Sequence, residues 1–266
     1  MFRAILLIWL GMLICTPQTR ADLSTNLAPA AQAQQAFNDT RALYKKEPRS
    51  AEAAWQFARA CFDKAEFATN SAERAKLAEL GIDACQQLIN RQSNSTPAHY
   101  YLAMNVGQLA RTRGLGALKL VKEMQREFTI ARGLDEHFDY AGPDRNLGLL
   151  YRDAPALGSI GSRTKARQHL ASAIEIAPEY PENRLNLIEA CLKWNDRNGA
   201  RRELKALEEA LPQARAKFAG ATWAASWTDW EQRLKTAKKK LEETPRTIET
   251  PRQKDLFSII RWPFYG

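Results

Sequence analysis

Prolines divide the chain into helical segments, and this feature constrains the fold more than any other. From residue 30 onward apolar residues recur with helical spacing, and no stretch alternates cleanly with β-branched residues as a strand would. Proline stops or starts a helix because it lacks an N–H and clashes with the preceding turn. Such prolines stand at segment edges, at Pro97, Pro143, Pro178, Pro181 and Pro212. The pattern predicts an all-α chain with helices at about 30–46, 50–68, 71–91, 97–112, 116–133, 143–152, 162–177, 181–195, 197–211 and 222–243.

Two consecutive units follow a known repeat. Leu147, Gly148 and Tyr151 match the first helix of the tetratricopeptide repeat (TPR), Trp-x2-Leu-Gly-x2-Tyr, although Asp144 stands where the repeat has Trp. The second helix of that unit ends at Pro178, and the next unit ends 34 residues later at Pro212, which is the period of this repeat.

Two earlier units match less well and need longer inserted turns. Trp55 and Phe62 open one of them, and Leu102 and Val106 open the other. A single hairpin cannot bury its apolar stripe alone, whereas stacked neighbours can. We therefore expect a tetratricopeptide-like right-handed α-solenoid of about four helical hairpins with capping helices at both ends.

The capping helices are predicted at residues 30–46 and 222–243. In the second of them Trp223, Trp227, Trp230 and Leu234 share one face, which favours a closing core layer. A ligand-binding aromatic cluster is the alternative for this face.

The stretch Gly142–Leu170 is rich in glycine but is not a phosphate-binding loop. Gly158-Ser159-Ile160-Gly161 is followed by residues in the wrong order and spacing for a P-loop, and no strand precedes it. We expect Gly148 to allow close helix contact, and Gly158 and Gly161 to form a lengthened turn.

The first 21 residues have the pattern of a secretion signal. Arg3 precedes an apolar run from Ala4 to Cys15, and Thr19-Arg20-Ala21 offers a cleavage site after Ala21. An uncleaved anchor or a buried first helix is the alternative, and Ile14 before Cys15 disfavours a lipoprotein. The pattern predicts an exported protein of the periplasm or cell envelope with a helical repeat domain at 22–244.

Residues 245–266 differ from the repeats. Pro245 and Pro251 break the helix, and seven large apolar residues then crowd together: Leu256, Phe257, Ile259, Ile260, Trp262, Phe264 and Tyr265. A tail with this many apolar residues is not expected to remain exposed to solvent. It is predicted to pack on the solenoid, dock a partner or make peripheral contact with a membrane.

Charge and cysteine content narrow the class of protein. Cleavage after Ala21 removes Arg3 and Arg20 and no acid, which lowers the formal net charge from +9 to +7. Behind an export signal, a basic balance with interspersed charges does not indicate nucleic-acid binding. The remaining cysteines, Cys61, Cys85 and Cys191, are odd in number and are expected to be buried apolar residues.

Enzyme signatures are missing from the sequence. It contains no Gly-x-Ser-x-Gly, no His-Glu-x2-His and no Cys/His spacing typical of a metal site. We therefore expect no catalysis, no metal and no cofactor.

A concave groove lined by the first helix of each unit is the expected binding surface. The residues assigned to it are Gln56, Asp63, Tyr100, Met104, Gln108, Arg145, Leu149, Arg152, Leu185, Glu189 and Lys193. Arg145 and Arg152 share a helix face, and two guanidiniums there could hold a carboxylate. Pairing with nearby acids such as Asp144 or Asp153 is the alternative.

The stretches "YYLAMNVGQLAR", "GPDRNLGLLYRDAP", "GSRTKARQHLASAIEIAPEYPEN" and "LEEALP" resemble the T component of TRAP transporters, the TatT family. The resemblance covers residues 50–212. It implies a non-catalytic, trimeric envelope protein that associates with a periplasmic solute-binding protein or transporter subunit, whose ligands are small organic acids or hydrophobic molecules. Family members are commonly lipoproteins, whereas Cys15 lacks the lipoprotein processing motif.

Two functions follow as expectations. The first is an exported binding or adaptor protein of a TRAP-type uptake system. The second is a general TPR scaffold that mediates protein–protein interactions at an envelope membrane.

Overall fold

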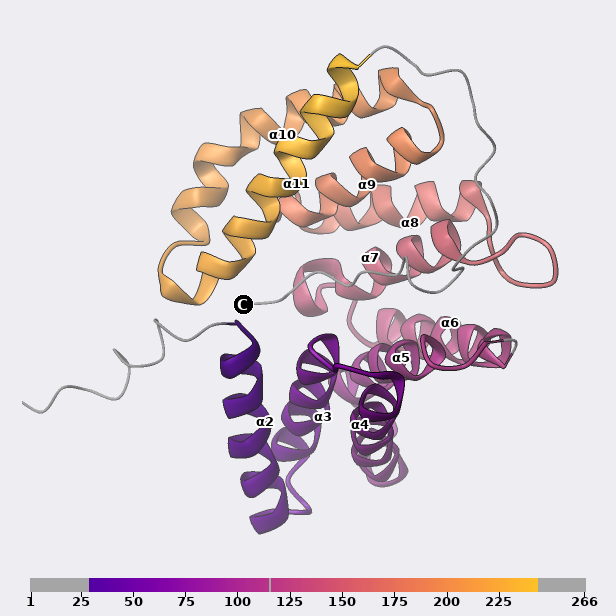
Figure 1. Ribbon diagram of the computed structural model, residues 1–266, viewed down its shortest axis with the longest axis vertical. Coiled ribbons are helices and arrows are strands. Elements are labelled where there is room, and N and C mark those ends of the chain that lie inside the picture. The colour runs from indigo at the N-terminus through magenta and orange to yellow at the C-terminus, as the bar shows by residue number, and fades with distance from the viewer. Residues whose placement is uncertain (1–28, 115, 244–266) are drawn as a thin grey trace, which may run out of the picture.

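The computed structural model describes residues 29–114 and 116–243, and this part of the chain is an array of packed α-helices (Figure 1). The signal segment and the aromatic tail therefore lie outside the described residues. The α-helices are α2 (Pro29–Lys46), α3 (Ala51–Glu66), α4 (Ser71–Arg91), α5 (Thr96–Ala110), α6 (Ala117–Leu134), α7 (Phe138–Asp153), α8 (Arg163–Ile176), α9 (Pro181–Lys193), α10 (Arg197–Lys217) and α11 (Ala224–Glu242). A short 3-10 helix, η1 (Ala221–Trp223), precedes α11.

The helices form four antiparallel hairpins, α3/α4, α5/α6, α7/α8 and α9/α10, between the terminal helices α2 and α11 (Figure 1). Each hairpin packs on the next, α2 covers α3, and α11 packs on α9 more than on α10. In this position α11 replaces the first helix of a further repeat. The predicted α-solenoid with two capping helices is confirmed.

Local sequence sets the helix starts. Ser50, Asn70, Ser162 and Asp196 each accept a hydrogen bond from a backbone N–H in the first turn of the helix that follows. Such caps satisfy N–H groups that have no partner within the helix. The predicted bounds therefore agree with most helices to within a few residues.

The end of α10 was predicted wrongly. Pro212 lies inside this helix, which continues to Lys217. Proline in a helix interior costs about 3 kcal/mol. The added turns bring Ala214 and Phe218 into the core, where both are buried, and this packing compensates for the missing hydrogen bond.

Glycines in and after α7 permit a close contact and a turn. A Cβ atom on Gly148 would lie 2.6 Å from Cγ of Leu170. The helices α7 and α8 can therefore approach this closely only because residue 148 has no side chain. Gly158 has a φ of 75° in the turn between the two helices. Both roles expected from the sequence are confirmed.

The start of α7 is unusual. Asp139, Tyr140 and Ala141 have φ values of 52°, 54° and 64°, which form a left-handed turn of three non-glycine residues. Right-handed geometry resumes just before Pro143, whose fixed φ suits the first turn of a helix. Left-handed backbone costs roughly 1–2 kcal/mol per residue, so surrounding contacts must hold this turn in place.

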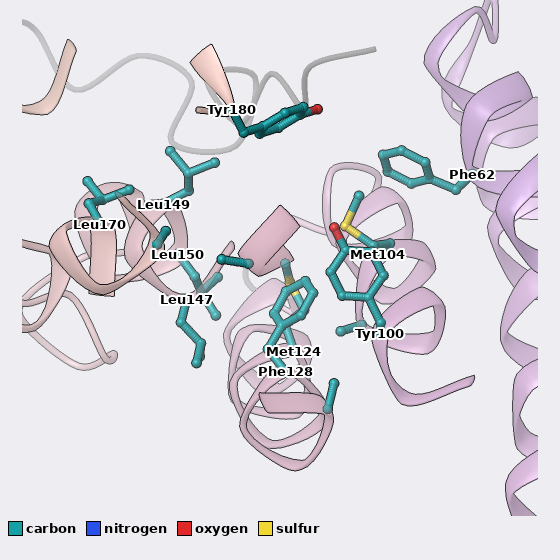
Figure 2. Close-up of a cluster of buried hydrophobic side chains, with 14 of the residues drawn as sticks. Phe62, Tyr100, Met104, Met124, Phe128, Leu147, Leu149, Leu150, Leu170 and Tyr180 are labelled. Carbon is teal, nitrogen blue, oxygen red and sulfur yellow. The ribbon is translucent and has the colours of Figure 1, made fainter. Parts of the chain in front are cut away.

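One large apolar core cluster includes residues from all four hairpins, and Figure 2 shows part of it. Cys61, Cys85 and Cys191 are buried in it as free thiols, as expected. Trp230 is 2% exposed, and Trp223, Trp227 and Leu234 pack against the same core. The tryptophans of η1 and α11 thus close the core.

Candidate functional site

The two ends of the solenoid line a common recess. It has a volume of about 740 Å³ and lies between α2 and α3 on one wall and α11 on the other. The lining residues are Pro29, Gln32, Ala33, Ala36, Thr40, Trp55, Gln56, Arg59, Ala60, Asp63, Phe67, Ala225, Thr228, Asp229 and Gln232. We call this recess the end groove.

The end groove is open because several of the side chains that line it are small and apolar. Ala36 on α2 and Ala225 on α11 are exposed and belong to opposite walls. Trp55 gives the groove a rigid aromatic surface, because its ring stacks on Tyr101 at 5.8 Å and its Nε1 donates to Glu52. An alanine-lined recess beside a fixed indole suits large apolar side chains.

Charged groups lie on both walls of the end groove. Arg59 and Asp63, one turn apart on α3, are 3.7 Å apart. Burial raises the pKa of Asp63 to about 6, although Arg59 opposes this shift. Across the groove, Asp229 lies 3.5 Å from Arg233. The end groove therefore offers carboxylates on both walls, together with apolar surface.

Seven of the eleven predicted groove residues divide into two groups. Gln56 and Asp63 line the end groove. Tyr100, Met104, Gln108, Leu149 and Leu185 are at most 4% exposed and lie within the helix packing, where Figure 2 shows Tyr100 and Met104 beside Met124 and Phe128. Their predicted contact with a ligand stays a prediction.

Arg145 is fully buried and holds the left-handed turn. Its Nη1 donates to the carbonyl oxygens of Asp139 and Tyr140, both at 3.1 Å, and its Nη2 donates to the Asp139 carboxylate at 2.7 Å. The hydroxyl of Tyr100 donates to the same carboxylate at 2.7 Å. Glu182 of α9 lies 3.7 Å from Arg145 Nε and is also fully buried.

Arg152 pairs with its sequence neighbour. Its Nη2 donates to Asp153 at 2.7 Å, and Lys193 donates to the same carboxylate at 2.7 Å. Glu189 lies 3.9 Å from Arg152 and receives two hydrogen bonds from Arg233. This is one of the two neighbour pairs considered from the sequence.

The other neighbour pair does not form. Asp144 is bound instead by Arg132 and His169, each at 2.7 Å, while Arg145 turns toward Asp139 and Glu182. Both arginines thus already contact carboxylates of this chain. A carboxylate ligand would have to compete with them.

Sequence reasoning missed the contributions of α2 and α11 to the groove. Gln32, Thr228 and Asp229 belong to helices that the pattern identifies only as caps. Their approach to α3 depends on the curvature of the whole array, which no local pattern reports.

Among the residues that the structure describes, no three His, Cys, Asp or Glu side chains gather in a way that could hold a metal ion. None of the helices in residues 29–114 and 116–243 combines the length and apolar content needed to cross a membrane.

Comparisons with known proteins identify the chain as TPR-like. A family model for tetratricopeptide repeats matches residues 161–221, and a model described as regulator of microtubule dynamics protein 1-3 matches residues 22–136. A thermophilic TPR protein of Thermus thermophilus is 20% identical, with a TM-score of 0.58 over 82% of this chain and 96% of that one. MamA is 16% identical, with a TM-score of 0.47 over 71% of this chain and 93% of MamA.

No match was found among curated proteins. The matched repeat and the shared fold support a TPR-like protein. The TRAP T-component assignment is not confirmed.

Proposed function

We propose that this protein is a non-catalytic scaffold that binds a segment of a partner protein in the end groove. The observation that carries the proposal is the recess of about 740 Å³ formed jointly by α2, α3 and α11. Pockets of this size commonly enclose a ligand among apolar walls with a few polar groups that orient it.

The chemistry of the walls indicates what the partner segment offers. Trp55 and the alanines suit aromatic or branched apolar side chains, which commonly anchor protein interfaces. Asp63 and Asp229 favour a basic residue beside those anchors. The partner segment is therefore apolar with at least one Lys or Arg.

Photo-crosslinking from both walls tests this function. A benzophenone amino acid is placed in the full chain at Gln32 on α2 or at Thr228 on α11, and at Lys205 as control. All three side chains are exposed, but Lys205 does not line the groove. We expect one segment of one partner protein to be captured from both walls and not from Lys205.

A charge reversal sharpens the test. Asp63→Lys should lower the yield of that adduct about tenfold, the size of effect expected when a buried ionic contact becomes repulsive. Equal capture from the groove and from Lys205 would contradict binding in the groove.

The partner's identity decides the biological setting. The apolar leader and the motifs of residues 50–212 support an exported adaptor of a TRAP-type uptake system, for which the captured partner would be a periplasmic solute-binding protein or a transporter subunit. Capture of a protein from another compartment would contradict this setting and leave the scaffold function intact.

The match over residues 22–136 supports a second candidate, a scaffold that acts on microtubules. On α6 within that range, Lys119 and Lys122 lie beside Glu123 and Arg126, and Arg126 pairs with Glu127. The two lysines suit an acidic partner. Co-sedimentation of the full chain with polymerised tubulin tests it. Loss of co-sedimentation in Lys119→Glu/Lys122→Glu would support this candidate, and absence of any co-sedimentation would exclude it.

A further inference from the structure

We propose that residues 254–266 of the same chain occupy the end groove and thereby compete with the partner segment. This inference rests on the proposed function, because both place a segment in the end groove. It adds that the chain's own tail regulates the partner's access to that groove.

The chain that follows α11 is long enough for the tail to reach the end groove. The α11 residues that line the groove, Ala225 to Gln232, precede the end of this helix at Glu242 by 10 to 17 residues. At 1.5 Å per residue they lie roughly 15 to 26 Å from that end. Residues 243–253 can cover about 36 Å when extended, so residue 254 can return to the groove along α11.

The shapes are complementary. The groove presents a fixed indole, Trp55, beside alanines on both walls, so its free volume faces small side chains. Residues 254–266 carry the densest run of large apolar side chains that follows α11, including Phe257, Trp262 and Phe264. The alanine side chains are too small to fill the recess, whereas aromatic rings are large enough to do so.

The charges are complementary as well. Arg261 stands between Ile260 and Trp262, in the middle of the apolar run. Asp63 and Asp229 lie on the two walls of the groove, and burial raises the pKa of Asp63 although Arg59 lies 3.7 Å away. The guanidinium of Arg261 adds a second positive charge beside these carboxylates.

Tethering makes a weak contact sufficient. A segment joined to its site by a short linker acts at an effective concentration in the millimolar range. The partner segment must therefore displace the tail, and weakening the tail should increase partner capture.

Within-chain photo-crosslinking of the full chain tests the proposal. With the benzophenone amino acid at Thr228, trypsin should release an adduct that contains Asp255–Arg261 or Trp262–Gly266. The same label at Lys205 should give these peptides about tenfold less often, because its reactive group reaches only groups in contact with it. Adducts are scored on single chains separated from crosslinked dimers.

A matched pair of variants shows that specific side chains are responsible. Trp262→Ala should lower the Thr228 adduct about tenfold, as expected for loss of a buried aromatic anchor. Arg252→Ala, which lies outside the apolar run, should leave it unchanged. Circular dichroism and thermal melting establish that both variants are folded.

Other results overturn the inference. Tail adducts found only between two chains would show exchange between copies, and tail peptides recovered equally from Lys205 would show that the groove is not preferred. If Thr228 captures the partner but never the tail, this inference fails and the proposed function stands. If Thr228 captures the tail but no partner, the proposed function fails and the tail is a structural plug.

Discussion

The N-terminal half of the solenoid, α2–α6, and the C-terminal half, α7–α11, are built from the same hairpins but are held together differently. Three charged side chains in the C-terminal half are fully buried: Asp144, Arg145 and Glu182. In the N-terminal half the buried charged side chains are His99 and Glu127, at 5% and 3% exposure, and they bind each other at 2.6 Å.

The difference shows two ways of fixing one repeat on the next. In the N-terminal half α3 and α5 meet through apolar contacts, such as Trp55 stacking on Tyr101 at 5.8 Å, and through the bond from the Asn105 amide to the Ala58 carbonyl. In the C-terminal half Arg145 also links the left-handed turn to α9 through directional bonds. These bonds fix the joint between the α7/α8 and α9/α10 hairpins, and the Tyr100 hydroxyl, which donates to Asp139, ties the same turn to α5. We therefore expect charge removal to affect the C-terminal half more.

The largest effect is expected for Arg145→Met. This change leaves Asp139 and Glu182 without their counter-ion and should destabilise the protein by about 3–5 kcal/mol, measured as a shift in urea unfolding. Arg113→Ala, which breaks an exposed pair with Glu79, is the control and should cost under about 0.5 kcal/mol. A cost under about 1 kcal/mol for Arg145→Met would mean that the joint does not depend on this network.

The second-largest change in stability is expected for a glycine of the C-terminal half, and a glycine of the N-terminal half is its control. Gly148→Ala places a Cβ 2.6 Å from Leu170 and should cost about 1–3 kcal/mol by overpacking. Gly133→Ala on α6 meets nothing within 4 Å and should stabilise by about 0.5–1 kcal/mol through helix propensity. Thermal melting measures both, and equal shifts would refute close contact at Gly148.

We expect the stability contributed by the buried ion pair of the N-terminal half to depend on pH. The hydrogen bond to Glu127 raises the pKa of His99, so the stability it contributes is fully present below the unfolded pKa of about 6.5 and is lost as the pH rises through the folded pKa. His99→Gln should therefore cost about 1–2 kcal/mol more at pH 5.5 than at pH 9. Urea unfolding at the two pH values checks this sign. A cost that grows with pH would contradict it.

The smallest effect is expected in the left-handed turn. Ala141→Gly removes a buried methyl group but relieves a φ of 64°, so the two terms should cancel to within about 0.5 kcal/mol. Ala131→Gly in the regular part of α6 has no strain to relieve and should cost about 1–2 kcal/mol. Equal costs in calorimetry would show that the turn is unstrained.

The sequence predicted the helices well because their signals are local. Ser162 and Asp196 cap helix starts, and Gly148 and Leu170 are related by the repeat spacing. It failed at Pro212, where burial of Phe218 outweighs a local penalty. The site was predicted only in part, since Gln56 and Asp63 line the groove while the opposite wall comes from α11.

The sequence by itself determined an all-α solenoid of four hairpins with closing helices, because helix periodicity, caps and repeat spacing depend on residues close together in the chain. Only the tertiary structure decided that Arg145 binds Asp139 and Glu182 rather than Asp144, and that α11 faces α2 and α3 across a recess. Both outcomes depend on the accumulated angles between successive hairpins. Those angles come from side-chain packing between repeats, which sequence spacing does not encode.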